Sequence, residues 1–547
     1  PQPAWSRKER LALTVLTLAV AAVSFWDLGD VTAPQNPLVS DGAVTEVRAE
    51  LSSPASVLWV YPGVCWGGSL TVYDASDTQL ASVELGGGTV FQWKEVALAA
   101  PAGGTLTLAV DNAQVMEAAF RGQDGALVAV SSDSPLFDEQ QWVPDSISYK
   151  NSMYFDEIYH GRTAYEHLHG LPVYETTHPP LGKVFIMLGV ALFGMTGFGW
   201  RVAGAAFGVA MVPVLYLLVR RLCRKPAFAL FAAALAALDT LRFAQSRIAT
   251  IDVYGTFFIL LAAYFMVWYC QSVLEKGVER SVLPMALAGL AFGLGPASKW
   301  TGLYAGAGLA VLYFGVRWRR ARQKPPRLKQ EIATALCGGV VFFVALPLIV
   351  YFASYIPYFW REGGFSLAEW WQCQVSMYRY HSTLVATHPY ESRWYTWPFS
   401  VRPVWYYLAS GLPQGLRGTI AALGNLPVWL AALAGLGWAF WRQLSGRGNG
   451  ATGAVTVLFL TQFLPWVLVS RCTFLYHYFP SLWFAVAALA LAAANLYERR
   501  PALARRLCIG IAAAAGVFFV CYYPVISGLP VAEPYVNALR ILPSWMF

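Results

Sequence analysis

The sequence predicts a polytopic α-helical membrane protein with about eleven transmembrane helices and a β-sandwich inserted near the N-terminus. Of its 547 residues, 57% are hydrophobic and 13% are charged, against about a quarter charged in a typical soluble domain. Mean hydropathy is +0.46. Apolar runs of roughly 20 residues, the length that crosses a bilayer, recur along the chain. These values exclude a disordered chain and a purely soluble enzyme, and eight cysteines are too few for a disulfide scaffold.

The first apolar run, at residues 11–26, follows Arg7, Lys8 and Arg10. Because no small-residue cleavage site follows it before Trp26, we expect a retained signal-anchor with a cytoplasmic N-terminus. Only one crossing fits between residue 156 outside and Arg220 inside, so residues 184–193 should lie in the interface or dip in and return. The eleven spans leave the tail at 527–547 outside. The ten spans after the first are predicted at 199–219, 226–243, 248–270, 282–297, 299–316, 332–356, 419–441, 452–470, 473–495 and 506–524.

The charges are segregated along the chain. Residues 27–150 contain 16 acidic and 4 basic side chains, a net charge of −12, so the rest carries +20. Short loops rich in Lys and Arg stay on the cytoplasmic side. The net positive charge of the remaining segments therefore indicates membrane topology, and no nucleic-acid partner is expected. The bases cluster at Arg220, Arg221, Arg224 and Lys225; at Arg317, Arg319, Arg320, Arg322, Lys324, Arg327 and Lys329; and at Arg499, Arg500, Arg505 and Arg506.

A different pattern marks residues 31–148, which we interpret as an extracytoplasmic β-sandwich-like domain. Short alternating runs occur at 70–72, 91–93 and 106–110, and glycine or Asp-Gly turns separate them at 67–68, 86–88, 103–104 and 124–125. Period-two alternation broken by such turns predicts antiparallel strands. A spacer or packing role is favoured, because aromatic residues in strands are usually core. The alternative is sugar or partner binding through Trp66 and Trp93.

Several ionisable residues fall at the span ends that this topology places outside. Charge in or near hydrocarbon is costly, so each is a candidate for function. One interpretation is a polar site at the outer membrane face, and the other is local ion pairing. Asp239 and Arg242 have the i,i+3 spacing of a helical pair, whereas Arg201 has no acidic residue within a helical turn. The remaining candidates are Arg247 with Asp252, Lys299 beside Trp300, and Arg471 with His477.

The segment from Tyr154 to Lys183 carries the densest chemistry. Asp156 and Glu157 are embedded in aromatic residues, which favours a cleft over a solvated loop. His178-Pro-Pro-Leu-Gly-Lys183 enters the interfacial helix with cations where an anionic headgroup would lie. A carboxylate can take a proton from a hydroxyl, and Arg or Lys can hold a phosphate. Together they suit transfer from a lipid-phosphate donor to a hydroxyl acceptor.

An ordered series of motifs over residues 150–547 resembles the protein O-mannosyltransferases, a branch of the GT-C membrane glycosyltransferases. The motifs are Phe155-Asp156-Glu157, His178-Pro179-Pro180-Leu181-Gly182-Lys183, Gly199-Trp200-Arg201, Ser246-Arg247 through Asp252, Ser298-Lys299-Trp300-Thr301-Gly302-Leu303, Trp394-Tyr395-Thr396-Trp397-Pro398 with Arg402-Pro403-Val404-Trp405-Tyr406, and His477-Tyr478-Phe479-Pro480.

The resemblance implies an inverting transfer of mannose from a polyprenyl- or dolichyl-phosphate donor to Ser or Thr of a secreted or membrane protein. It implies that Asp156 is the catalytic base, that Glu157 helps hold the acceptor, and that Arg201 binds the donor phosphate. No cofactor or metal is implied, although other GT-C branches use a divalent ion and Asp156 with Glu157 would be its ligands. Further donor-side residues are His178, Lys183, Arg247, Asp252 and Lys299; acceptor or outer-loop residues are Trp394, Trp397, Arg402 and His477.

Two features depart from the family. The outer loop at 357–403 is too short for the β-trefoil domain of eukaryotic members, which favours a bacterial-type enzyme in the plasma membrane. The β-rich insertion has no counterpart in yeast-like members and leaves the acceptor open. The expected organisation is a first helix within 1–30, the β-domain at 31–148, and a membrane domain at 149–547 whose catalytic outer loop is 150–198.

Three other functions stay open from the sequence. The same chemistry could act on a lipid or a cell-wall glycan. A transporter of lipid-linked sugar would use the membrane charges as a pathway, although no repeat pairs the two halves. A third alternative is a protein that only binds, through the β-domain. Sugar identity, lipid length and oligomeric state are not determined, and Cys65 and Cys373, both in predicted outer segments, could pair.

Overall fold

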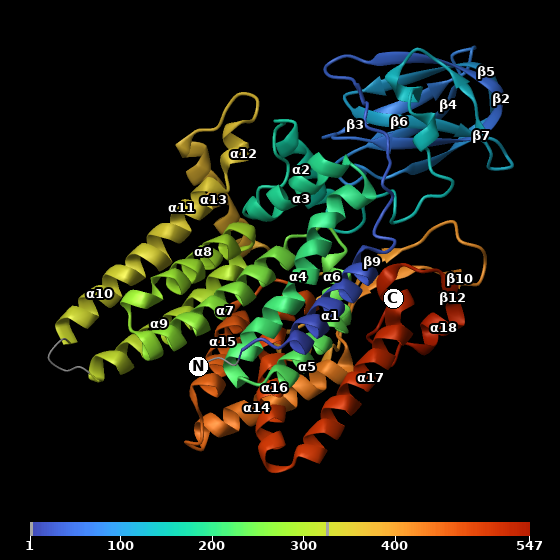
Figure 1. Cartoon of the computed structure of the whole chain (residues 1–547). Coiled ribbons are helices and arrows are strands. Elements are labelled where there is room, and N and C mark those ends of the chain that lie inside the picture. The colour runs from blue at the N-terminus through green and yellow to red at the C-terminus, as the bar shows by residue number, and fades with distance from the viewer. Residues whose placement is uncertain (1–3, 324–327) are drawn as a thin grey trace.

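A bundle of long helices with an antiparallel β-sheet region at one end makes up the protein (Figure 1). The computed structural model describes residues 4–323 and 328–547. The short helices α2 (Glu157–Leu168), α3 (Leu181–Phe193), α12 (Ile356–Phe359) and α13 (Leu367–Thr383) lie at the same end of the bundle as the sheet. The predicted outer segments 150–198 and 357–403 are therefore largely folded, and they gather around one end of the helices.

Among the described residues, seven helical segments are long and apolar enough to cross a membrane. The helices α5 (Pro226–Ala237) and α6 (Thr240–Ser246) are apolar enough only as a pair, and they meet at 58°, the geometry of a broken span or of a re-entrant loop. The protein is thus a multi-pass helical membrane protein, as predicted. The seven are α4 (Gly197–Cys223), α7 (Asp252–Lys276), α8 (Val282–Ser298) with η3 (Glu279–Ser281), α10 (Leu328–Val340) with η6 (Val341–Ala345) and α11 (Leu346–Ala353), α15 (Gly450–Phe463) with η8 (Leu464–Leu468), α16 (Phe479–Arg499) with η9 (Leu475–Tyr478), and α17 (Pro501–Ser527).

Three other predicted spans are helices that fall outside this set: α1 (Arg7–Phe25), α9 (Leu303–Arg322) and α14 (Leu426–Leu444). The predicted span at 419–441 also begins too early. Residues Thr419–Ala422 form strand β11, which pairs with β9 (Val404–Leu408). Asn425 starts α14, because its side chain accepts a hydrogen bond from the Val428 N–H at 3.4 Å.

The length of α3 favours the predicted interfacial position of residues 184–193, which stays a prediction. Its 13 residues span about 20 Å at 1.5 Å per residue, whereas the hydrocarbon core is about 30 Å thick. Pro180 precedes its first turn, and Gly194, at a φ of 76°, ends it. The helix therefore presents the His-Pro-Pro motif at the sheet end of the bundle without crossing.

The predicted antiparallel strands are confirmed in one hydrogen-bonded sheet, in the order β1-β6-β2-β5-β3-β4, with β7 on β6 and β8 on β2. One predicted strand is wrong: residues 91–93 form a turn, and Phe91 has a φ of 51°. The Phe91 ring packs 5.1 Å from Tyr165 of α2, so this turn is a contact with the helices. The strands are β1 (Leu38–Val39), β2 (Thr45–Pro62), β3 (Gly68–Tyr73), β4 (Gln79–Leu85), β5 (Lys94–Asp111), β6 (Gln114–Arg121), β7 (Leu127–Val128) and β8 (Val130–Ser131).

The remaining short elements lie in the loops and the C-terminal tail. Strand β12 pairs with β10 and so joins the tail to the segment before α14. All eight cysteines fall within the described residues and are free, so Cys65 and Cys373 are not paired in this structure. The short elements are η1 (Pro135–Phe137), η2 (Gln140–Trp142), η4 (Trp300–Gly302), η7 (Trp394–Phe399), β10 (Leu416–Arg417), β12 (Val531–Ala532) and α18 (Glu533–Ala538).

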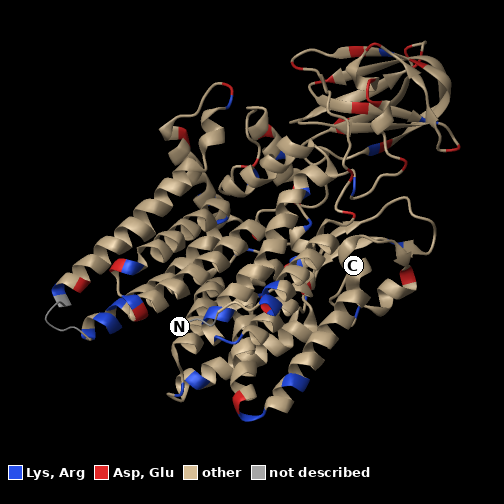
Figure 2. Ribbon diagram, in the orientation of Figure 1, with Lys and Arg blue, Asp and Glu red and all other residues tan. Residues whose placement is uncertain are grey.

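Charge is distributed unevenly between the two ends of the molecule. Figure 2 shows many of the Lys and Arg residues at the helix ends away from the sheet, and acidic residues spread over the sheet region. Lys324 and Arg327 of the predicted basic cluster lie outside the described residues. The arrangement agrees with the segregation that the sequence shows.

A close backbone approach at Gly197 generates a test of the fold. A Cβ atom there would overlap the carbonyl oxygen of Lys150, so Gly197→Ala should lower the unfolding free energy by about 1–3 kcal/mol. Gly510→Ala in α17 is the control, because nothing lies within 4 Å of its Cβ position. Melting temperatures in detergent measure both. Equal melting of Gly197→Ala and the wild type would contradict this packing.

Candidate active site

Asp156 stands at the N-terminus of α2 with a free carboxylate. Phe155 before it has a φ of 50°, and its ring packs 4.6 Å from Tyr406. The backbone carbonyl of Asp156 accepts hydrogen bonds from the N–H groups of Tyr159 and His160, at 3.1 and 3.2 Å. Its partly exposed side chain makes no hydrogen bond or ion pair with any described residue. A strained loop therefore holds an accessible carboxylate ready for a ligand, as is common at active sites.

The surroundings of Asp156 adjust its proton affinity. Burial, together with the negative charges of Asp252 and Glu175, raises its pKa to about 7, while Lys299 opposes the rise. A general base works best with a pKa near the operating pH. Asp156 is thus suited to accept a proton at neutral pH.

Glu157 has the opposite environment. Its side chain is fully buried, and its two oxygens accept four hydrogen bonds, two from Arg201 at 2.6 and 2.7 Å, one from the Tyr154 N–H at 3.2 Å and one from the Ala249 N–H at 2.9 Å. In this structure no oxygen of Glu157 is left for a ligand, and its predicted contact with the acceptor stays a prediction.

Arg201 is likewise committed within the protein. An arginine offers five N–H donors, and those of Arg201 make five hydrogen bonds: two with Glu157, and one each with the carbonyls of Leu28 (3.1 Å), Tyr149 (2.6 Å) and Ser152 (3.3 Å). The side chain is fully buried. The phosphate contact stays a prediction, and a phosphate could bind Arg201 only by displacing one of these partners.

The His-Pro-Pro motif forms a second closed network. Lys183 is fully buried, and its Nζ donates to the Glu175 carboxylate at 2.5 Å and to the carbonyls of Glu175 and His178 at 2.8 and 3.0 Å. These three bonds use every donor of a lysine, so Lys183 does not offer the predicted cation to a ligand. Burial alone would raise the pKa of Glu175, but Lys183 and His178 outweigh it and hold the pKa well below its usual value.

His178 lies at the accessible edge of this network. Its side chain is 23% exposed, and its Nδ1 lies 3.1 Å from Glu175. Its ring is 5.1 Å from that of His381 in α13 and 5.7 Å from that of His160. Of the predicted donor-side residues in this motif, His178 alone keeps a surface that could meet a ligand.

Asp252 and Lys299 lie together near Asp156. Asp252 opens α7, Lys299 follows the end of α8, and the Lys299 Nζ donates to the Asp252 Oδ1 at 2.6 Å. Both side chains remain slightly exposed, at 13% and 11%. Their charges act on Asp156, so two predicted residues 47 positions apart in sequence meet at the candidate base.

Arg247 has a structural position. Its Nη1 donates to the carbonyls of Ser24 (2.8 Å) and Trp26 (2.6 Å), and its Nη2 donates to that of Asp27 (2.8 Å). These carbonyls end α1, where a cation satisfies orphan acceptors and opposes the helix dipole. Arg247 thus caps a helix end, and its donor-side role stays a prediction.

The outer-loop residues line two different environments. Trp397 is fully buried and stacks 5.8 Å from the His477 ring, and Trp394 packs 5.2 Å from Phe463. Arg402 instead lines a polar cavity of about 570 Å³ together with Arg393 and Arg471. None of these three arginine side chains makes an ion pair or hydrogen bond with a described residue. The remaining lining residues are Ala386, Thr387, Glu391, Ser392, Thr396, Val401, Ser470, Cys472, Thr473 and Ser544.

Arg471 was singled out by its charge at a span end but was not assigned to the site. The charges of Arg471 and Asp156 both act on the Tyr380 hydroxyl, whose pKa is raised mainly by burial. Both charges are therefore close enough to Tyr380 to act on its hydroxyl. In the sequence, the feature that pointed to Arg471 was a charged residue at the outer end of a predicted span.

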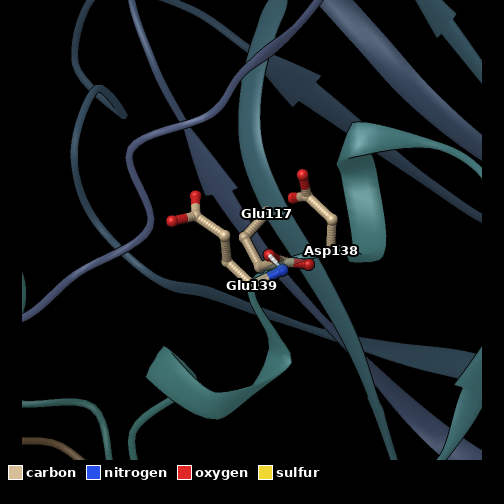
Figure 3. Close-up of side chains that lie close together, drawn as sticks. All are labelled: Glu117, Asp138 and Glu139. Atoms are coloured by element: carbon tan, nitrogen blue, oxygen red, sulfur yellow. Dashed lines mark hydrogen bonds between the residues drawn. The ribbon is translucent and has the colours of Figure 1, made fainter.

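The group of carboxylates that could hold a metal within the described chain lies in the sheet region. Figure 3 shows Glu117, Asp138 and Glu139 with their side chains close together. Glu117 accepts hydrogen bonds from the Glu139 N–H at 2.8 Å and from Gln140 Nε2 at 2.7 Å, and burial raises its pKa to about 8. These oxygens are already held by N–H donors. Asp156 and Glu157 belong to no such group among the described residues.

Two family models match most of the chain. Residues 145–361 match the dolichyl-phosphate-mannose-protein mannosyltransferase model, and residues 366–545 match the C-terminal four-transmembrane region of protein O-mannosyltransferases. The chain belongs to the protein O-mannosyltransferase family. It is therefore a membrane glycosyltransferase of the GT-C type, as the motifs predicted.

Similar proteins agree with this assignment. A polyprenol-phosphate-mannose–protein mannosyltransferase of Mycolicibacterium smegmatis is 29% identical over 72% of this chain and 87% of its own length. One from Corynebacterium glutamicum is 26% identical over 77% of this chain and 90% of its own length. In fold, the chain resembles a protein O-mannosyltransferase complex of S. cerevisiae bound to the sugar donor, with a TM-score of 0.62 at 15% identity, covering 72% of this chain and 89% of that one.

The buried pair generates a test that separates structure from substrate binding. Arg201→Ala leaves Glu157 buried without its partner, so we expect a loss of about 3–5 kcal/mol of unfolding free energy. The double variant Glu157→Gln with Arg201→Met removes both charges and should recover part of that loss. Thermal melting and the donor KM are measured together. Normal melting of Arg201→Ala with a raised donor KM would restore the phosphate role.

Proposed function

We propose that the protein transfers mannose from polyprenyl-phosphate mannose to Ser or Thr hydroxyls of proteins, with inversion, and that Asp156 is the base. The observation that best supports this proposal is the Asp156 carboxylate, which has no hydrogen-bond partner, has a pKa of about 7 and lies near the Asp252–Lys299 ion pair. The names of the relatives supply the donor and the class of acceptor. The family models cover both the segment that bears Asp156 and the one that bears Arg471.

The chemistry follows from one accessible carboxylate. The acceptor hydroxyl gives its proton to Asp156 while its oxygen attacks C1 of the sugar. The bond between C1 and the phosphate oxygen breaks, and its electron pair stays on the polyprenyl phosphate. Attack from the face opposite the leaving phosphate inverts the configuration at C1. Cations near the leaving oxygen stabilise the charge that develops there.

Lys299 and Arg471 are the proposed phosphate contacts. Arg201 and Lys183 have no free donors, whereas Lys299 spends one hydrogen bond on Asp252. Arg471 makes no ion pair with a described residue and faces a cavity that it shares with two further arginines. We propose that the phosphate lies at the Lys299 side of this cavity and that His178 borders the sugar.

The proposed reaction uses no metal ion. Glu157 cannot join Asp156 as a ligand without giving up its bonds to Arg201 and to two backbone N–H groups. Lys299 and Arg471 supply the positive charge that a cation would otherwise bring. Unchanged activity in a chelator supports this part of the proposal, and loss restored by a divalent ion contradicts it.

The proposed topology puts the site outside the plasma membrane and the N-terminus in the cytoplasm. Many Lys and Arg residues lie at the helix ends opposite the sheet (Figure 2), which suits the cytoplasmic side. Counting α1, α9, α14 and the bent α5–α6 pair with the other seven segments makes eleven crossings. The sheet region is proposed to be a sandwich, because the β2–β5 pairing shifts register between Leu51 and Val57, where both strands can fold over.

The central test replaces the base. Asp156→Asn should abolish transfer of [³H]mannose from the polyprenyl-phosphate donor to secreted proteins while leaving melting and donor binding unchanged. In the wild type, the rate should fall about tenfold per pH unit below pH 7, because protonated Asp156 cannot accept the hydroxyl proton.

The identity of the labelled product decides the acceptor. Label in protein supports the proposal, whereas label in a lipid or a glycan favours the alternative acceptor on the same site. Movement of intact donor across vesicles without bond cleavage would favour the transporter. Full activity of Asp156→Asn would exclude the assigned base.

A second variant tests the phosphate site. Arg471→Gln should raise the donor KM about tenfold, the size expected for one lost charge-assisted hydrogen bond. Its melting temperature should stay at the wild-type value, because Arg471 has no partner to lose among the described residues. The control is Arg506→Gln, an exposed arginine at the start of α17. An unchanged donor KM would move the phosphate away from Arg471.

A further inference from the structure

The sheet region lies outside both family models, yet it contacts the helix that carries the candidate base. The models begin at residue 145. Met153 donates its N–H to the Phe91 carbonyl at 2.9 Å, and the Trp93 N–H donates to Ser152 Oγ at 3.1 Å. Phe91 also packs on Tyr165 of α2. The sheet region is therefore fastened directly to the loop and helix that position Asp156.

At this junction, exposed aromatic side chains form a continuous row. Trp66, in the loop between β2 and β3, is 59% exposed, and its ring lies 5.2 Å from that of Tyr174 in the loop before α3. The Tyr174 ring stacks parallel to that of Tyr159 in α2, at 6.3 Å and 2°. Tyr174 and Tyr159 are 37% and 39% exposed. Trp93, the other tryptophan considered from the sequence, is buried and takes no part.

The buried Arg162 side chain packs against two of these aromatic rings. Its side chain is fully buried, its Nε donates to Glu166 at 2.7 Å, and its guanidinium carbon lies 4.7 Å from the Trp66 ring and 4.1 Å from the Tyr174 ring. Nη1 and Nη2 have no hydrogen-bond partner. Glu166 also accepts the Tyr174 N–H at 2.8 Å. A buried cation thus orients two rings from different regions of the chain, and its two Nη groups remain without a hydrogen-bond partner.

The row leads to the candidate base. Tyr159 lies one helical turn from Asp156, and burial and the Asp156 charge raise its pKa. Trp66, Tyr174 and Tyr159, here called the aromatic row, therefore extend from the sheet region to within one helical turn of Asp156.

We propose that the aromatic row binds the acceptor polypeptide in an extended conformation, so that the sheet region takes part in selecting the acceptor. This inference rests on the proposed function. Alternate residues of an extended chain are about 6.6 Å apart, which is close to the 6.3 Å between the Tyr174 and Tyr159 rings, and the Trp66 and Tyr174 rings are 5.2 Å apart. Rigid aromatic rings are preferred contacts at peptide-binding surfaces. The row joins a loop of the sheet region to α2, which carries the candidate base, and relatives of this chain are named for transfer to protein, so a polypeptide is the occupant that we propose.

The test compares two peptide acceptors on the full-length enzyme in detergent. One peptide has five residues around a single Thr, and the other has fifteen with the same Thr at its centre. Trp66→Ala should raise the KM of the long peptide about fivefold or more, as loss of an aromatic anchor does. The KM of the short peptide, the KM of the donor and kcat at saturating peptide should stay within about twofold of the wild type.

Matched variants separate binding from folding. Trp66→Phe keeps a ring over Arg162 and should recover most of the long-peptide affinity. Trp142→Ala removes an equally accessible tryptophan, 40% exposed, from the same region and should behave as the wild type. An equal effect of Trp66→Ala on both peptides, or no effect on either, would overturn the proposal.

A direct binding measurement works without turnover. The long peptide carries a photoreactive benzophenone side chain four residues from the Thr and is crosslinked to Asp156→Asn. Crosslinks in fragments that contain Trp66 or Tyr174 support the row, and crosslinks confined to other fragments contradict it. If the wild type transfers mannose to no protein, the proposed function fails, while the crosslinks still decide the row.

Discussion

The buried ion pair between Arg201 and Glu157 is the interaction on which the site depends. The hydrogen bonds of these two side chains join five segments: the end of α1, the loop before α2, the first residue of α2, helix α4 and the segment before α7. Removing two charges from water is expensive and is repaid only when every donor and acceptor is satisfied. Every donor of Arg201 and both oxygens of Glu157 are hydrogen-bonded here. The pair therefore fixes how these segments pack against one another.

The Arg201–Glu157 ion pair explains how two adjacent carboxylates, Asp156 and Glu157, acquire different properties. Glu157 is enclosed by Arg201 and by backbone N–H groups, so its oxygens are committed within the protein. Asp156, one residue earlier, is turned away by the strained Phe155 and keeps both oxygens unbonded. Burial and two nearby carboxylates then raise its pKa to about 7. The pair in the sequence is thus a scaffold residue next to a reactive one.

The same distinction accounts for which site residues the sequence could identify. The ordered motifs indicated the family and selected Asp156, Asp252 and Lys299, which do converge. They could not separate a cation available to a ligand from one spent inside the protein, because hydrogen-bond saturation depends on carbonyls such as those of Leu28 and Ser24, far away in the chain. In the structure, Arg201, Arg247 and Lys183 are held by internal partners, whereas Arg471 has none among the described residues and lines a cavity.

The sequence by itself determined the membrane class, the helix positions, the alternation of the sheet strands and the family, because hydrophobic run length, period and motif order are local properties. The tertiary structure alone decided that residues 91–93 turn to meet α2, that Trp66 joins Tyr174 above a buried Arg162, and that three arginines line one cavity. These features depend on contacts between segments that lie about 70 to 110 residues apart. No periodicity or spacing within a single segment encodes such contacts, since each arises only when the packed core brings the segments together.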